Sequence, residues 1–322
     1  MKKLVNGALA VVMCLYLLPH DALAARQLVP VGKVVGLELS NDTVCVAAFD
    51  DTIGTAAKDA GLKIGDEIIN IDGVAVDDAA EVRQALERSD GRVSLRILRG
   101  GSEHDLSLTP AITEDGPRLG VYLRQGVTGI GTVTWYDPAT GDFGTLGHGV
   151  NNSKGELVKM TSGKVYSASV LSVKRGKCGE PGQLRGGVDS AAALGKLEKN
   201  TLQGVFGSAD TGWKGETVQT ASADEIETGP ATICSTVSGD SVQEYSVEIL
   251  KIYPNSKAEG RNMLLRVTDP ALLAATGGIV QGMSGSPIIQ DGKLVGAVTH
   301  VLVNDPTTGY GIFIDNMLDA AA

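Results

Sequence analysis

The stretch GMSGSPIIQDGKLVGAVTH, from Gly282 to His300, places a serine in a glycine-rich turn ahead of two apolar runs. An Asp-Gly pair separates these runs, and this pattern is a strong signal for a tight β-hairpin. Ser284 is therefore expected at the start of a hairpin, which excludes the strand-to-helix nucleophile elbow of α/β-hydrolases. The glycines would free the backbone amides of Gly282 and Ser284 to face a developing oxyanion, so the turn predicts a nucleophilic serine. A glycine-serine turn without a chemical role is the alternative.

A serine nucleophile requires a neighbouring base, and histidine is the usual base near neutral pH. The sequence has four histidines. His20 lies in the N-terminal segment, His104 lies in a polar stretch, and His300 ends a strand that leads away from the serine. Glycines flank His148 and would expose its imidazole at the end of a strand. We therefore predict His148 as the base and His300 as a hydrogen-bonded core or rim histidine.

A carboxylate usually completes such a site by orienting the imidazole. Asp269 ends a β run immediately before a proline, which would leave its carboxylate at a loop edge. Spacing alone leaves Asp189, Asp210 and Asp240 open as alternatives. An aspartate before proline is also a common turn cap, so a purely structural role stays open at this point.

The chain carries 28 Lys and Arg against 38 Asp and Glu, a formal net charge of -10. This balance argues against nucleic acid or an anionic lipid surface as the main partner and favours peptides or other proteins. Residues 1–25 combine two lysines, an apolar run and an Ala-Leu-Ala site, which predicts a secretory signal peptide, with a membrane anchor as the alternative. In either case the body of the protein is expected to be exported.

Three cysteines follow that segment, at positions 45, 178 and 234. Export permits one disulfide, and Cys178 with Cys234 is the expected pair because both lie in one domain. Three buried thiols are the alternative. The sequence contains no CxxC motif or Cys/His cluster, so we expect no structural metal. The serine and histidine chemistry predicted above requires neither a metal nor an organic cofactor.

Residues 28–112 are expected to form a small unit with one helix at 79–86. Within it, Gly61 to Val76 contains a glycine-aspartate turn, a short apolar strand and an Asp-Gly hairpin signal, and resembles the PDZ domains of exported proteases. PDZ domains bind an extended peptide by adding it to a sheet edge. We expect Gly36, Leu37, Glu38 and Leu39 to form the peptide-binding loop, with an ordinary strand as the alternative.

From residue 118 to 322 the sequence changes to short β-branched runs separated by glycine, apart from a helical pattern at 190–197. Many short strands with turn signals predict an all-β barrel or sandwich. The expected fold is therefore mainly β, with a PDZ domain followed by a larger β domain.

The strings Thr145 to His148, Thr268 to Pro270 and Thr276 to Ile289, together with the PDZ unit, resemble the stage IV sporulation protein B peptidase family. The resemblance implies a trypsin-like double β-barrel with His148, Asp269 and Ser284 as catalytic residues. It further implies cleavage of the chain itself and of an inhibitory membrane protein, stage IV sporulation protein FA, which releases an intramembrane protease that matures sigma-K. The implied location is the space between the two forespore membranes, and the PDZ domain is implied in substrate targeting and control of self-cleavage.

Two other functions are compatible with an exported PDZ protein. One is a non-catalytic adaptor whose barrel is only a scaffold, because fold resemblance alone does not establish chemistry. A complete histidine, aspartate and serine set argues against it. The other is a general extracytoplasmic quality-control protease, which fits the family-specific C-terminal stretch less well.

Overall fold

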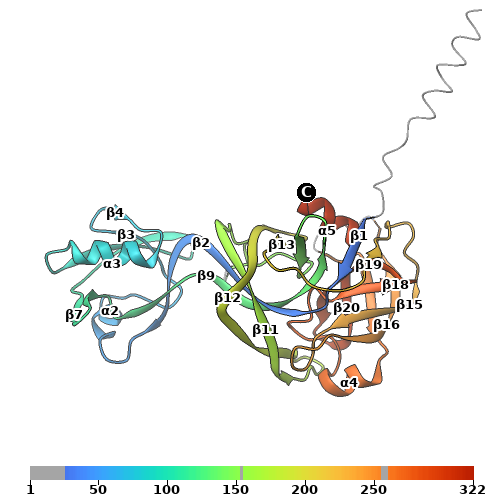
Figure 1. Ribbon diagram of the computed structural model, residues 1–322. Coiled ribbons are helices and arrows are strands. Elements are labelled where there is room, and N and C mark those ends of the chain that lie inside the picture. Colours follow the sequence, from blue (N-terminus) through green and yellow to red (C-terminus); the bar gives the residue numbers. More distant parts are fainter. Residues whose placement is uncertain (1–25, 153–154, 255–259) are drawn as a thin grey trace, which may run out of the picture.

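The computed structural model describes residues 26–152, 155–254 and 260–322, and shows two lobes joined by two long strands (Figure 1). The strands are β1 Gln27–Pro30, β2 Val34–Phe49, β3 Glu67–Ile71, β4 Val74–Ala75, β5 Val93–Arg99, β6 Ser102–Leu108, β7 Ala111–Thr113, β8 Gly116–Arg118, β9 Val121–Tyr136, β10 Asp142–Thr145, β11 Ser162–Lys174, β12 Gln183–Thr201, β13 Gly204–Ala209, β14 Val218–Gln219, β15 Gly229–Ser235, β16 Gln243–Ile252, β17 Met263–Val267, β18 Pro287–Gln290, β19 Lys293–Leu302 and β20 Asp305–Phe313. The helices are α2 Thr55–Asp59, α3 Ala79–Glu87, α4 Pro270–Thr276 and α5 Ile314–Ala321.

The smaller lobe is a PDZ domain. Its sheet has the strand order β9-β2-β3-β5-β6, and α3 packs against the apolar core of this sheet. The predicted helix is confirmed as α3. Its N-cap is Asp78, whose side chain accepts a hydrogen bond from the Glu81 amide at 2.7 Å. Asp66 in the predicted glycine-aspartate turn is buried and pairs with Arg99 at 2.7 Å. Local turn chemistry therefore forms as the sequence indicates.

The larger lobe contains two closed barrels. In the first, β9, β10, β13, β12, β11 and β2 follow one another, and pairing of β2 with β9 closes the ring. In the second, the ring order is β15-β16-β17-β20-β19-β18. The expected double β-barrel is confirmed, and each barrel surrounds apolar side chains.

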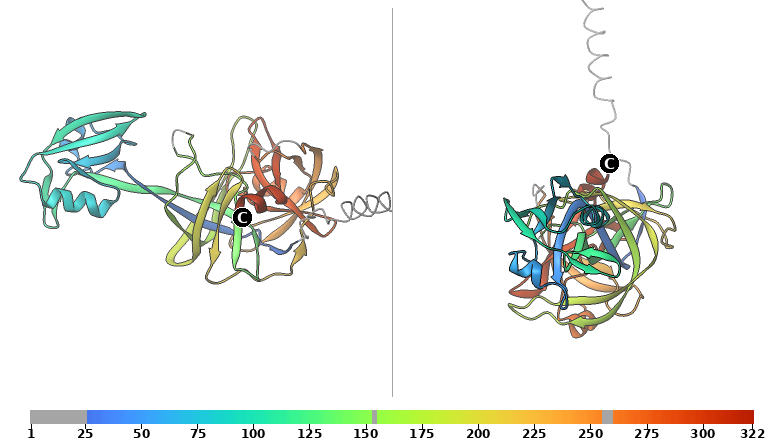
Figure 2. Two further views of the ribbon diagram at one scale, coloured as in Figure 1. Left: turned by 90° about the horizontal axis from the view of Figure 1, so that it is seen from above. Right: turned by 90° about the vertical axis from the view of Figure 1, so that its left-hand side faces the viewer.

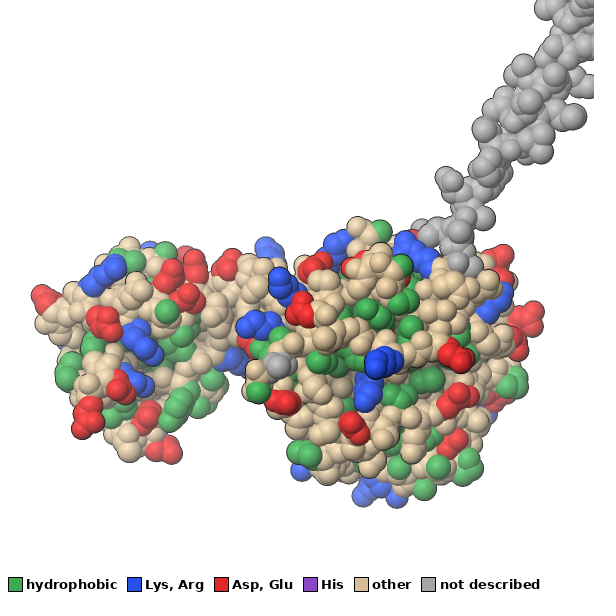
Figure 3. All heavy atoms as spheres, in the orientation of Figure 1, with side chains coloured by type: hydrophobic (Ala, Val, Ile, Leu, Met, Phe, Trp, Pro, Cys, Tyr) green, Lys and Arg blue, Asp and Glu red, His purple; other side chains and the backbone are tan. Residues whose placement is uncertain are grey.

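The strands β2 and β9 belong to both lobes. Each is 16 residues long, and they pair antiparallel from Val34↔Thr132 in the first barrel to Phe49↔Val121 in the PDZ domain. Figure 2 shows these two strands crossing the narrow connection between the lobes. Figure 3 shows charged side chains of both signs scattered over both lobes.

This arrangement corrects several expectations. The first residues assigned to the PDZ unit, up to Leu39, lie in the barrel, where β1 pairs with the end of β9 and β2 pairs with β11. The helical pattern at 190–197 forms part of β12, because barrel closure pairs it with β11 and β13. Cys178 and Cys234 are free thiols and form no disulfide.

The expected signal peptide or anchor at 1–25 lies outside the described residues. Within the described ranges, none of the helices has the length and apolar character needed to span a bilayer.

Candidate active site

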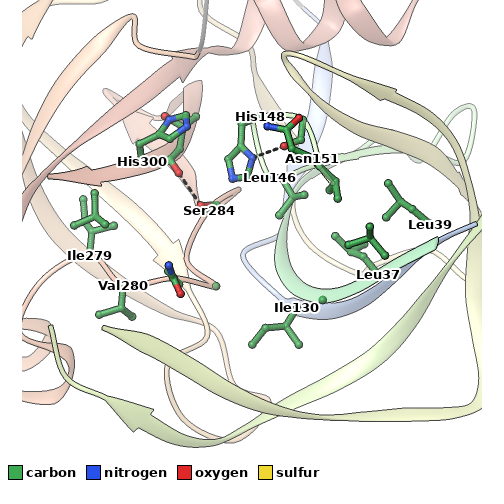
Figure 4. A pocket seen from close by; sticks show the side chains of 18 residues that line it. Leu37, Leu39, Ile130, Leu146, His148, Asn151, Ile279, Val280, Ser284 and His300 are labelled. Atoms are coloured by element: carbon green, nitrogen blue, oxygen red, sulfur yellow. Dashed lines mark hydrogen bonds between the residues drawn. The ribbon is translucent and has the colours of Figure 1, made fainter. Parts of the chain in front are cut away.

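A cavity of about 450 Å³ opens between the two barrels (Figure 4). Ser284, His148 and His300 lie close together on its wall. Apolar side chains form much of the remaining wall, with Leu37, Leu39 and Ile130 from the first barrel and Ile279 and Val280 from the second. The predicted serine and base are thus brought to one apolar cleft from segments 136 residues apart in the sequence.

The nucleophile turn has the predicted form. Ser284 precedes the hairpin of β18 and β19, and Gly282 and Gly285 adopt φ values of 99° and 96°, which favour glycine. A side chain at Gly285 would also collide with the carbonyl of Thr132. Within the described parts of the chain, the amides of Gly282 and Ser284 have no hydrogen-bond acceptor. Neither amide is therefore engaged by another described protein group, and their role as oxyanion donors stays a prediction.

Thr132 on β9 joins the nucleophile turn to the histidine turn. Its amide donates to the Ser284 carbonyl at 3.0 Å, and its Oγ1 donates to the Gly282 carbonyl at 2.8 Å. Its own carbonyl accepts hydrogen bonds from Thr145 Oγ1 at 2.6 Å and the Leu146 amide at 3.3 Å. Sequence reasoning missed this buried residue, because a threonine within a β run carries no distinguishing signal.

His148 follows a tight turn in which Leu146 has a φ of 69° and Gly147 a φ of 70°. Its Nδ1 lies 2.9 Å from the carbonyl of Gly149. A carbonyl only accepts hydrogen bonds, so this contact assigns the proton to Nδ1 and leaves Nε2 as the basic nitrogen. Burial lowers the pKa of His148, while the Gly149 carbonyl acts in the opposite direction. The imidazole is therefore neutral at pH 7 and suited to accept a proton.

His300 lies beside His148, with ring centroids 5.2 Å apart and planes tilted by 38°. The prediction of a hydrogen-bonded rim histidine was wrong in one respect, because Nδ1 of His300 is buried without a partner among the described residues. Burial, with smaller effects from His148 and Arg261, lowers the pKa of His300 to about 4. Two neutral imidazoles thus share the cavity.

The Ser284 hydroxyl donates to the Thr299 carbonyl at 2.7 Å (Figure 4). Attack on a substrate requires the hydroxyl to leave this carbonyl and turn toward His148. The structure does not bring Asp269 to the cavity, since its carboxylate caps α4. The alternatives Asp189, Asp210 and Asp240 are exposed and also lie outside the cavity lining.

The prediction of the PDZ peptide-binding loop was wrong. Gly36, Leu37, Glu38 and Leu39 pair with β11 on one edge and β9 on the other, so they have no free edge to offer a peptide. Leu37 and Leu39 line the active-site cavity instead.

A different groove in the PDZ domain lies between α3 and β9. It encloses about 250 Å³, and Val82 and Leu86 face Leu119, Val121 and Leu123 across it. In this domain β9 pairs only with β2, which leaves its other edge toward α3. The sequence analysis did not predict this groove. It placed the peptide-binding segment at residues 36–39, ahead of helix α3, whereas β9 follows α3 in the chain. The Leu-Gly-Val sequence at 119–121 is the signal that could have identified the strand.

Two closed β-barrels with a serine and a histidine in the cavity between them have the architecture of trypsin-like serine peptidases, here joined to a PDZ domain. The sequence matches the SpoIVB peptidase S55 family over residues 115–318 and a PDZ domain over residues 53–99. The chain therefore belongs to the SpoIVB peptidase S55 family.

Among curated proteins, the chain is similar to one named as a zinc metalloprotease in Rhizobium meliloti, with 32% identity over 101 residues, covering 31% of this chain and 26% of that protein. The chain thus spans about a quarter of the length of the curated relatives it matches. Among solved structures it resembles the PDZ domain of the SdrC-like protein from Listeria monocytogenes, with 26% identity, coverage of 26% and 88%, and a TM-score of 0.23. It also resembles the active form of the Rv3671c protease from M. tuberculosis, with 15% identity, coverage of 76% and 85%, and a TM-score of 0.34.

Proposed function

We propose that this chain is a sporulation signalling peptidase that cleaves itself and then a membrane-bound regulatory protein of the stage IV sporulation protein FA type. That cleavage would trigger intramembrane maturation of sigma-K. The protein would act after export, between the two forespore membranes, either free or tethered by its N-terminal segment. The observation that carries the proposal is the family match over residues 115–318, combined with Ser284 and His148 on one cavity wall.

In the proposed reaction Ser284 Oγ attacks the peptide carbonyl as His148 Nε2 takes its proton. The amides of Gly282 and Ser284 stabilise the oxyanion, and the protonated His148 then donates to the leaving amine. Water hydrolyses the acyl-enzyme with His148 again as the base. The walls formed by Leu37, Leu39 and Ile130 favour apolar substrate side chains at the cleavage site.

The PDZ domain would hold a protein substrate as an added strand on the free edge of β9, with an apolar side chain between Val82 and Leu86. Val82→Glu would place a charge in this groove. We expect the variant to cleave the protein substrate more slowly while its reaction with a small active-site probe stays unchanged.

The test compares the full-length protein with its Ser284→Ala variant. Both are followed by intact mass over several hours and after addition of a fluorophosphonate, and both are mixed with the extracytoplasmic part of the membrane regulator. Fragments, a probe adduct and substrate cleavage that depend on Ser284 support the proposal. Equal behaviour of the two proteins would favour the adaptor, and equally rapid cleavage of unrelated unfolded proteins would favour quality control.

A further inference from the structure

Strand β9 borders both the active-site cavity and the PDZ groove. Its residues Val127, Gly129 and Ile130 line the cavity. Its residues Val121 and Leu123 line the groove beside α3. Both places where a substrate would bind therefore lie along one strand, which crosses the narrow connection between the lobes (Figure 2).

The backbone of β9 presents an edge for strand addition toward the cavity. The Val133 amide donates to the carbonyl of the residue before β2, whereas the Thr132 amide donates to the Ser284 carbonyl on the opposite side of the strand. Successive residues of a strand alternate between its two edges, so the backbone groups of Thr128 and Ile130 face the same side as those of Thr132. Among the described strands, β9 pairs only with β2 in this stretch. The amides and carbonyls of Thr128 and Ile130 are therefore placed to pair with a bound peptide.

The arrangement of the two barrels around Ser284 sets the direction of the bound chain. His148, which would give its proton to the leaving amine, belongs to the first barrel, as does Ile130. The wall that contains Ile279 and Val280 belongs to the second barrel. The segment C-terminal to the scissile bond departs as the amine, so it lies on the side of the first barrel, against β9. The PDZ residues of β9 precede Ile130 in the chain, so this segment would run antiparallel to β9 on its way from the serine to the groove.

The length of β9 sets the spacing between the two sites. Leu123 and Ile130 are seven positions apart in the sequence and both pair with β2. At about 3.3 Å per residue this separation is about 23 Å, and an added strand needs about seven residues to cover it. Thr132, two positions beyond Ile130, holds the nucleophile turn, so only about one to three further residues separate the scissile bond from Ile130.

From these observations we infer that a substrate binds as one extended strand along the edge of β9, from the active site to the PDZ groove. Its scissile bond lies at Ser284, and an apolar residue about 8–12 positions C-terminal to that bond lies between Val82 and Leu86. The inference rests on the proposed function, in which Ser284 is the nucleophile and His148 the base. It defines the substrate as an extended segment with an apolar anchor at a fixed spacing and on one side of the cleavage site.

The test uses the full-length protein and a series of fluorophosphonates joined to the N-termini of Ser/Thr/Gln peptides. Each peptide carries one leucine, at spacings from about 4 to about 16 residues from the phosphorus. Ser284 Oγ displaces fluoride from the phosphorus, and intact mass gives the rate of adduct formation. We expect this rate to peak at a spacing of about 8–12 residues, at about ten times the rate of the leucine-free probe. A gain that changes only slowly with spacing is the behaviour of a flexible tether and would overturn the inference.

Direction and strand pairing are tested with modified probes. The same peptides joined to the fluorophosphonate through their C-termini should show no peak. Methyl groups on the alternate amides that face β9 should slow the reaction of the best probe, while methyl groups on the amides between them should not. Val82→Glu should remove the peak, because it places a charge where the leucine binds. An equal peak in the reversed series, or an equal effect of methylation at every amide, contradicts a single added strand.

A binding measurement separates this inference from the proposed function. If no probe labels Ser284, the proposed function fails, and the hydrolysed phosphonates, which form no covalent bond, decide the inference. Their binding to the full-length Ser284→Ala protein is followed by fluorescence anisotropy. An affinity maximum at the same spacing supports the single strand, and an affinity that does not depend on spacing overturns it.

Discussion

His300 should make the free energy of unfolding of this protein depend on pH. The pH range is set by the lowered pKa of its imidazole in the folded chain. Its pKa falls from 6.5 to about 4 in the folded chain because the ring is buried beside His148. Below pH 6.5 the unfolded chain takes up a proton at this residue while the folded chain does not. The stability that His300 contributes is therefore fully present above pH 6.5 and is lost as the pH falls toward 4. Linkage gives a loss of about 2 kcal/mol between pH 7 and pH 5, rising to about 3 kcal/mol at pH 4.

The assay is urea unfolding at several pH values between 7 and 4, in the Ser284→Ala background so that self-cleavage does not interfere. His300→Gln should remove this part of the pH dependence, so its unfolding free energy should fall less steeply below pH 6.5. His104→Gln, at an exposed position in the PDZ domain, is the matched control for replacing a histidine away from the cavity. Parallel curves for the His300→Gln protein and its parent would refute the reasoning.

Three further substitutions test the structure. Thr132→Val leaves the Gly282 carbonyl without its side-chain donor, and should lower the free energy of unfolding by about 1–3 kcal/mol and lower kcat with little change in KM. Thr132→Ser keeps the hydroxyl and should restore both quantities, as measured by urea unfolding and peptide hydrolysis. Arg99→Leu leaves Asp66 buried and unpaired, and should destabilise the PDZ domain by about 3–5 kcal/mol in urea unfolding. Gly126→Val, at a φ of 73° against the Leu39 carbonyl, should loosen the β2–β9 pairing and make the connection sensitive to limited proteolysis, and equal resistance would contradict this.

Local signals in the sequence predicted the parts of the fold that depend on local contacts. The Asp-Gly hairpin after Ser284 and the capped helix α3 involve residues within a few positions of one another. The exchange of β2 and β9 between the two lobes involves partners such as Phe49 and Val121, which no short pattern connects. The helical pattern at 190–197 forms strand β12 for the same reason. Pairing with β11 along the barrel outweighs the weak intrinsic helix propensity of these residues.

The site shows the same division. The serine turn and the histidine turn could be predicted because glycine at positive φ and a free imidazole have recognisable neighbours in sequence. The partner of His148 could not, because a backbone carbonyl has no sequence signal and an aspartate before proline suits a cap as well as a triad.

The shared strands give the two lobes a direct physical connection. On β9, Val121 and Leu123 face the PDZ groove, and Thr132 holds the carbonyls of Gly282 and Ser284 at the active site. A peptide added to the edge of β9 would therefore bind to the same strand that positions the nucleophile turn. One continuous strand thus carries both the edge of the PDZ groove and the threonine that holds the serine turn, an arrangement that only long-range strand pairing could produce.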